Sequence, residues 1–240
     1  MNHTAEHDPL AGVLNIHQRL LRRSKQPWTL GQLHPRTARP DQSLFPDLAP
    51  CQPYQSVLSQ ALAPLRGRQR LDELPGTQLD PLLLAVVRAE GPVHLDVLIA
   101  RLLAEVVRSR SSARLQHRIL TRLNELAAAG VLEQCGHFSA LHHQLRTPPY
   151  RDWRAQTERL RRLEYVHDRE LMQAIWRVVD ASPDLSVDQA MNDGLHAIGF
   201  IRLTANARER AEGPLQALLQ SGLLAPHGDR LIPGPWSFVR

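Results

Sequence analysis

The sequence predicts a mainly α protein with small β hairpins, built from two copies of one unit that follow each other along the chain. Three observations predict this fold class: one half of the sequence repeats the other, apolar residues recur at helical spacing, and short apolar segments alternate around a glycine. The chain has 240 residues, 42% of them hydrophobic, which is enough to bury a core in one large domain or two small ones.

The repeat is the strongest of these observations. Residues 79–141 align with residues 171–233 without a gap, and apolar positions, a turn glycine and two arginines keep the same register. Identical pairs include Asp96/Asp188, Arg110/Arg202, Arg118/Arg210, Gly130/Gly222 and Gly136/Gly228. A match of this length in one register predicts two copies of the same fold.

Each copy is expected to contain three helices and a hairpin. The first helices are predicted at residues 79–89 and 168–181, the second near Asp96 and Ser186, the third at 113–129 and 205–221, and the hairpins at 131–138 and 223–232. A glycine follows each third helix, where a left-handed cap is favoured. Three helices followed by a two-stranded ribbon are typical of a winged helix, whose third helix lies in the major groove of DNA.

The predicted fold class is therefore mainly α with small β wings, in tandem winged helix-turn-helix domains. Six prolines between Gln26 and Pro53 predict an extended strap after a helix at residues 9–24, and a further helix is expected at 54–65. The expected domains are an N-terminal helix and proline-rich strap (1–75), a first winged-helix domain (76–145), a connector helix (146–166), and a second winged-helix domain with its tail (167–240).

Charge and composition favour a nucleic-acid-binding protein and argue against a membrane protein or a disulfide-rich one. The formal net charge is +5, and every basic residue except Lys25 is an arginine, which grips phosphate with a planar fork. No apolar run is long enough for a bilayer span, so we expect no membrane contact and a cytoplasmic, nucleoid-associated protein. Two distant cysteines, Cys51 and Cys135, do not form a disulfide framework.

An arginine stripe on the third helix of the first copy is the sharpest candidate site. No acid lies between Glu105 and Glu125, and three of the arginines recur every four residues beside an apolar face. The candidate DNA-binding residues are Arg108, Arg110, Arg114, Gln116, Arg118, Arg122 and His137 in the first copy, and Arg202, Arg208 and Arg210 in the second. Among them, Gln116 is the candidate base reader and His137 a wing contact to the DNA backbone. An ordinary solvated face is the alternative for the stripe. Acids interrupt the second set, so protein contact is the alternative there.

No catalytic or metal site is predicted. The histidines and carboxylates show no nucleophile or partner at catalytic spacing. Cys135 and His137 lie two residues apart, but their spacing to His142 and His143 matches no structural zinc pattern. We therefore expect no cofactor, no metal and no enzymatic activity.

Several motifs resemble a known family. They are the segment from Glu90 to Asp96, the arginines and serines before the first third helix, Gly199-Phe200 with Leu224 and Asp229, and the upstream Tyr54. Over roughly residues 53–233 the chain resembles a bacterial domain of unknown function, of winged-helix type, usually found at the C-terminal end of large DNA helicase and nuclease-like proteins. This sequence departs from those proteins in lacking a GxxxxGK[ST] phosphate loop. The resemblance implies a DNA-related context and no activity for this chain.

The expected function is duplex DNA binding, mainly through the DNA backbone, in genome maintenance or the response to DNA damage. One alternative is a dimeric interaction subunit of a chromosome-organising or helicase and nuclease complex. Another is a transcription regulator or plasmid-type replication initiator. The expected partners are double-stranded DNA and, under these alternatives, a second copy of the chain or a helicase or nuclease.

Overall fold

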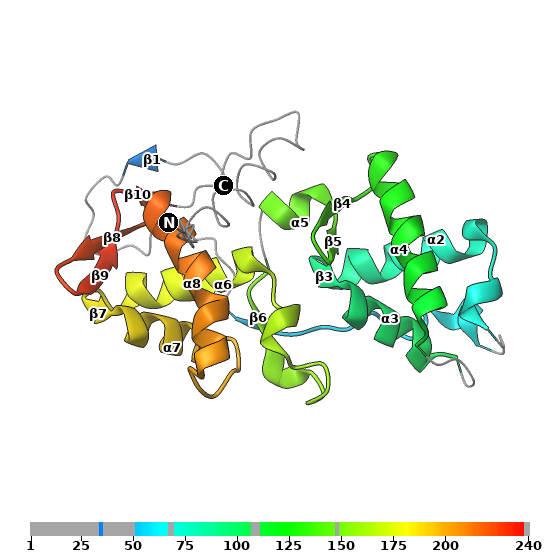
Figure 1. Cartoon of the computed structure of the whole chain (residues 1–240), viewed down its shortest axis with the longest axis horizontal. Helices are drawn as coiled ribbons and strands as arrows, with labels where there is room; N and C mark the ends of the chain where they lie inside the picture. The colour runs from blue at the N-terminus through cyan, green and yellow to red at the C-terminus, as the bar shows by residue number, and fades with distance from the viewer. Residues whose placement is uncertain (1–33, 36–50, 67–69, 107–110, 147–148, 238–240) are drawn as a thin grey trace, which may run out of the picture.

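A computed structural model of the chain describes residues 34–35, 51–66, 70–106, 111–146 and 149–237 (Figure 1). The described part is mainly helical with small sheets. The expected helix at 9–24, most of the strap, Arg108 and Arg110 lie outside the described residues. No described helix is both long and apolar enough to cross a membrane.

The first unit follows the predicted order of elements. It consists of α2 (Gly76–Glu90), β3 (Val93–His94), α3 (Leu95–Ala104), α4 (Ala113–Ala128), β4 (Glu133–Cys135) and β5 (Phe138–Ala140). All three strands are antiparallel, and β5 lies between β3 and β4. The short strand β3, which precedes α3, is therefore an edge strand paired with β5 of the hairpin.

The second unit has the same order and the same sheet. It consists of α6 (Asp168–Ala181), β7 (Leu185–Ser186), α7 (Val187–Ala197), α8 (Ala205–Gln220), β8 (Leu224–His227) and β9 (Arg230–Pro233), with β9 between the other two strands. A further pair of strands, β1 (His34–Pro35) and β10 (Trp236–Ser237), is antiparallel. The two predicted sets of three helices and a hairpin are thus confirmed.

The repeat extends upstream of the aligned sequence. A 3₁₀ turn precedes each first helix, η2 (Leu71–Glu73) in the first unit and η4 (Leu163–Tyr165) in the second. An arginine begins each turn and pairs with an acid two residues later. The Arg70 Nη2 to Asp72 Oδ2 distance is 2.8 Å, and Arg162 Nη1 lies 3.2 Å from Glu164 Oε1. The duplicated segment therefore includes the entry into each unit.

Local signals explain the boundaries of the third helices. Ser112 caps α4 by accepting a hydrogen bond from the Leu115 amide, and Thr204 caps α8 by accepting one from Ala207. Gly130 and Gly222 follow these helices with φ of 72° and 70°, a left-handed conformation that favours glycine. The caps and glycines fix the same helix length in both units.

The expected helix at residues 54–65 is wrong. The segment contains β2 (Gln52–Pro53), turns, and the 3₁₀ helix η1 (Ala63–Leu65). Its backbone bonds go to distant partners: β2 pairs in parallel with β6 (Arg151–Asp152), and the Val57 amide donates to the Glu90 carboxylate at 2.8 Å. Tertiary hydrogen bonds here override a local helical pattern.

The expected connector helix at residues 146–166 is also wrong. After the short helix α5 (His142–Arg146), the described connector holds β6, η3 (Trp153–Ala155) and η4. Trp153, Leu160 and Val166 are buried, so the segment packs between the units instead of standing out as a charged helix. An extended path brings these side chains to both units.

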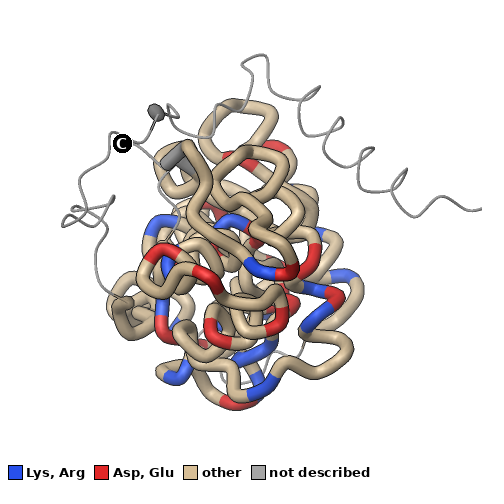
Figure 2. The backbone as a smooth tube through the Cα atoms, turned by 90° about the vertical axis from the view of Figure 1, so that its left-hand side faces the viewer, with Lys and Arg blue, Asp and Glu red and all other residues tan. Residues whose placement is uncertain are grey.

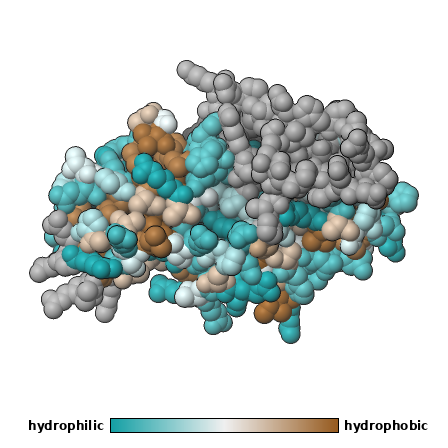
Figure 3. Space-filling view, turned by 180° about the vertical axis from the view of Figure 1, so that it is seen from behind, coloured by the Kyte–Doolittle hydropathy of each residue, from teal (hydrophilic) through white to brown (hydrophobic). Residues whose placement is uncertain are grey.

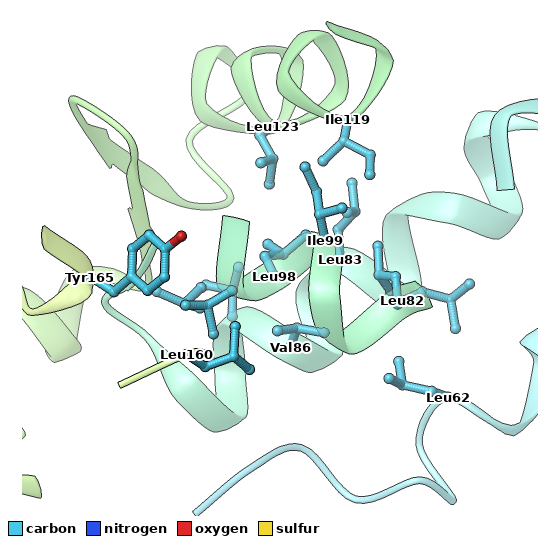
Figure 4. Close-up of a cluster of buried hydrophobic side chains, with 14 of the residues drawn as sticks. Leu62, Leu82, Leu83, Val86, Leu98, Ile99, Ile119, Leu123, Leu160 and Tyr165 are labelled. Atoms are coloured by element: carbon cyan, nitrogen blue, oxygen red, sulfur yellow. The ribbon is translucent and has the colours of Figure 1, made fainter. Parts of the chain in front are cut away.

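The two units share a hydrophobic core. Ile119 and Leu123 of α4 point toward Ile99 and its neighbours in the first unit (Figure 4). The same cluster includes Leu171 and Ile198 of the second unit, while a separate cluster fills the space between α6, α7 and α8. The surface seen in Figure 3 shows small apolar patches among hydrophilic residues. The units therefore pack against each other through a continuous interior.

Candidate nucleic-acid interface

The outward face of α4 carries uncharged hydrogen-bonding side chains. Leu115, Ile119 and Leu123 are buried on one side of the helix. Gln116 is exposed at the edge of this buried side, and His117, Thr121 and Asn124 are exposed on the opposite side. The sequence analysis proposed Gln116 as a base reader and gave His117, Thr121 and Asn124 no role in DNA binding. The helical period, counted from the buried Leu115, Ile119 and Leu123, would have placed His117, Thr121 and Asn124 on one face.

Arg118 does not belong to this free face. Its side chain is half-buried, and its two amino groups donate to the backbone carbonyls of Asp72, at 2.5 Å, and Leu74. Arg122 is likewise engaged: it forms a bidentate pair with Asp80, with Nε 2.9 Å from Oδ1, and also contacts Glu125. The expectation of one free arginine stripe is therefore wrong for these two residues.

Arg114 is the described arginine of the stripe that remains open to solvent. Its side chain is 78% exposed, and its closest carboxylate oxygen, Asp72 Oδ2, lies 3.8 Å from Nε. That carboxyl group is already held by Arg70, whose hydrogen bond lowers the pKa of Asp72. Arg114 thus keeps most of its capacity to meet an anion.

The second unit shows a similar division. Arg210 pairs with Asp168 and donates to the Val166 carbonyl at 2.6 Å, and Arg208 pairs with Asp188, which raises the pKa of Arg208. Arg202 is exposed, with no ion pair to any residue that the structure describes. Of the three candidates in this unit, only Arg202 is open.

Arg118 and Arg210 perform the same structural task. The two arginines are matched positions of the repeat. Arg118 donates to the Leu74 carbonyl and Arg210 to the Val166 carbonyl, and these two acceptors are matched positions as well. Each arginine ties the third helix of its unit to the segment that enters the first helix. The repetition of these arginines in the sequence therefore has a structural explanation.

We expect that removing these arginine hydrogen bonds lowers the stability of the fold. Arg118→Ala removes charge-assisted bonds to two carbonyls and should lower the free energy of unfolding by about 1–3 kcal/mol. Arg210→Ala should act in the same direction. Arg114→Ala on the same helix is the matched control, with an expected change within about 0.5 kcal/mol. Urea denaturation of the three variants measures the difference, and equal midpoints for Arg118→Ala and Arg114→Ala would contradict it.

The hairpin of the first unit lies at the junction of the units. His137 is exposed near its turn, with its ring centroid 5.6 Å from that of His94. The neighbouring Phe138 packs edge-on against His167 of the second unit, with 5.0 Å between the two ring centroids. The expected wing residue is therefore held next to the second unit, on a different element from the outward face of α4.

A buried charged cluster at the same junction was missed by sequence reasoning. Arg151 bridges the units: Nη2 lies 2.6 Å from Glu170 Oε2, and Nη1 donates to the Glu90 carbonyl at 2.6 Å. Glu90 in turn forms an ion pair with Arg101, whose Nε lies 2.9 Å from Glu90 Oε1. Tyr54 packs against Arg151 with 4.5 Å from Cζ to the ring centroid, and burial raises the pKa of Tyr54. These residues are far apart in sequence and carry no spacing signal.

On the end of the molecule drawn in Figure 2, the described charges do not form one continuous basic face. Figure 2 shows arginines and acids interspersed over the end of the molecule that faces the viewer. Among the described residues, no three histidine, cysteine or acidic side chains gather as metal ligands. Among the candidate arginines that the structure describes, Arg114 and Arg202 are thus the ones open to solvent.

Comparison with known proteins gives one partial match. A family model described as a protein of unknown function (DUF3320) matches residues 70–117, from the entry of the first unit into the first half of α4. Neither a curated protein nor a solved structure matches the chain. Residues 70–117 are thus similar to a domain of unknown function, and this part of the resemblance seen in the sequence is confirmed.

Proposed function

We propose that the chain is a non-catalytic DNA-binding protein whose two units are winged helices, with α4 as the helix that meets duplex DNA. The observation that carries the proposal is the outward face of α4. It presents hydrogen-bonding side chains and Arg114, and the helix carries no acid before Glu125. Asparagine and glutamine side chains match adenine in the major groove, and arginine matches phosphate.

The order of elements supports this assignment. In a winged helix the third helix follows two others and precedes the hairpin, and α4 and α8 both stand in that place. The proposed contact set keeps Arg108, Arg110, Arg114 and Gln116 and gains His117, Thr121 and Asn124, while His137 and Arg202 lie on other elements and stay outside it. Arg118, Arg122, Arg208 and Arg210 leave it because they are already bound within the chain. A role in genome maintenance is proposed from the family resemblance.

The test measures, by fluorescence anisotropy, how the affinity of the full chain for random DNA duplexes depends on salt concentration. We expect Arg114→Ala to weaken binding to all duplexes and to lower the salt slope by about one unit, as loss of one phosphate contact does. The double change of Gln116 and Asn124 to alanine should keep the slope and reduce discrimination between sequences.

Arg159→Ala is the control, because Arg159 is an exposed arginine on the connector. It should leave affinity and slope unchanged. Absence of binding at low salt, or equal losses for Arg159→Ala and Arg114→Ala, would contradict the proposal.

A further inference from the structure

A cleft of about 960 Å³ lies in the second unit between α8, the loop before it and the connector. Leu163, Phe200 and Pro214 contribute apolar walls, and Arg161 and Arg202 lie at the same cleft. The DNA-binding proposal gives this cleft no role. The cleft lies along the side of α8 that matches Arg114, Arg118 and Arg122 of α4 in the repeat.

The repeat shows which side chains stand at the matched place in the first unit. In the first unit the Arg122 side chain lies over Gly76, where a Cβ atom would meet its Cζ at 3.0 Å. The matched position in the second unit is Pro214, preceded by Gly213, whose missing side chain would extend into open space. Pro214 therefore stands where the first unit has the long Arg122, and Gly213 stands where it has Thr121.

The cleft exposes apolar surface. Ile201 is 72% exposed and lines the cleft beside the half-buried Phe200. A large aliphatic side chain that is open to water next to an apolar wall gains free energy when a partner covers it. The lining therefore favours an occupant with an apolar anchor.

The charged side chains of the cleft that have no partner among the described residues indicate the charge of its ligand. Arg210 is balanced by Asp168, and Glu164 by Arg162. Arg161 and Arg202 have no ion pair or side-chain hydrogen bond to any part of the chain that the structure describes, while Glu209 is the remaining acid. After internal pairing, two guanidinium groups stand against one carboxylate, which favours an anionic partner.

We propose that this cleft binds an acidic peptide segment of another protein, with an aliphatic or aromatic anchor on Ile201 and Phe200 and carboxylates on Arg161 and Arg202. Duplex DNA fits the lining less well. Glu164, Asp168 and Glu209 also face the cleft, and the connector forms one of its walls. A continuous phosphate backbone would meet these acids, whereas a peptide can place single carboxylates on the arginines. In this arrangement the first unit contacts DNA and the second contacts protein.

The test begins with selection of random twelve-residue peptides, displayed on phage, against the immobilised full chain. We expect the enriched peptides to combine an apolar residue with flanking aspartate or glutamate. A synthetic enriched peptide, labelled for anisotropy, should bind about tenfold or more weakly to Ile201→Glu and to Arg202→Glu. Both residues are exposed, so circular dichroism should show unchanged folding.

The matched controls are Leu58→Glu and Arg159→Glu, because Leu58 is 73% exposed and neither residue lines the cleft. Both should bind the peptide as the unaltered chain does. Arg114→Ala should also bind it normally, so failure of this inference is distinguishable from failure of the DNA proposal. Enrichment of basic peptides, no enrichment, binding that ignores Ile201→Glu, or competition by duplex DNA would each overturn it.

Discussion

Replacing Arg151 with methionine is expected to lower the free energy of unfolding by about 3–5 kcal/mol, the usual cost of removing one partner of a buried pair. Glu170 has no exposed surface, and its carboxylate receives Arg151 Nε at 3.1 Å and Nη2 at 2.6 Å. Without the guanidinium, a buried carboxylate loses its cation, and the Glu90 carbonyl loses a donor. Urea or thermal unfolding of the variant measures the loss.

A double-mutant cycle separates the pair from the packing. Arg151→Met combined with Glu170→Gln removes both charges of this pair, so the double variant should be more stable than Arg151→Met alone. The exposed pair Arg162 and Glu164 is the matched control, and its disruption should cost about 1 kcal/mol or less. Equal costs for Arg151→Met and Arg162→Ala would contradict a structural role for the cluster.

This cluster bears on function because it joins the two units. Arg151 belongs to the connector, Glu90 ends α2 of the first unit, and Glu170 lies on α6 of the second. The shared apolar core surrounds the same junction. A rigid junction sets the spacing between the outward face of α4 and the cleft on α8. The proposed DNA and peptide contacts would then act at a fixed separation, without the freedom of a flexible linker.

The regular elements of both units could be predicted from the sequence because their determinants are local. Helical periodicity located α4 and α8, and the glycines marked where they end; in the structure Ser112 and Thr204 cap the residues where they begin. The repeat added a second, independent copy of each signal. Residues 54–65 and the connector before Arg162 carried no such repetition, and their hydrogen bonds come from distant partners.

The candidate site could be predicted only in part, because sequence shows a charge without its partner. Arg114 and Arg118 lie one turn apart on α4 and look equivalent in the sequence. In the structure, one is open to solvent and the other is bound to carbonyls more than forty residues away. Backbone acceptors have no sequence signature at all. The outward face of α4 is predictable from periodicity, whereas the loss of Arg118 and Arg122 from it is not.

Acidification is expected to destabilise the chain from about pH 6.5 downward through His167. This side chain is 5% exposed, and burial lowers its pKa to about 4, with Arg169, Arg210 and Arg151 acting in the same direction and Asp168 against it. Its Nδ1 accepts the Arg169 amide hydrogen bond that caps α6, so the neutral ring is the form that fits. Protonation would also charge a ring that packs against Phe138.

The sign follows from linkage between protonation and folding. The unfolded chain binds a proton at His167 near pH 6.5, whereas the folded chain resists it until about pH 4. The stability contributed by the neutral form is therefore complete above pH 6.5 and is lost as pH falls toward 4, by an amount on the order of 3 kcal/mol. His94, whose pKa burial also lowers, adds a loss of the same sign.

His167→Asn isolates this contribution, because asparagine retains a capping oxygen and does not titrate. We expect it to flatten the dependence of unfolding free energy on pH between about pH 6.5 and 5, where carboxylates are still ionised. His143→Asn, at an exposed site on α5, is the control for removing one histidine. If His167→Asn kept the full decline with pH, the acid sensitivity would have to arise from other groups. Since His167 begins the second unit and packs on the hairpin of the first, the same titration should weaken the junction that holds the two proposed binding surfaces together.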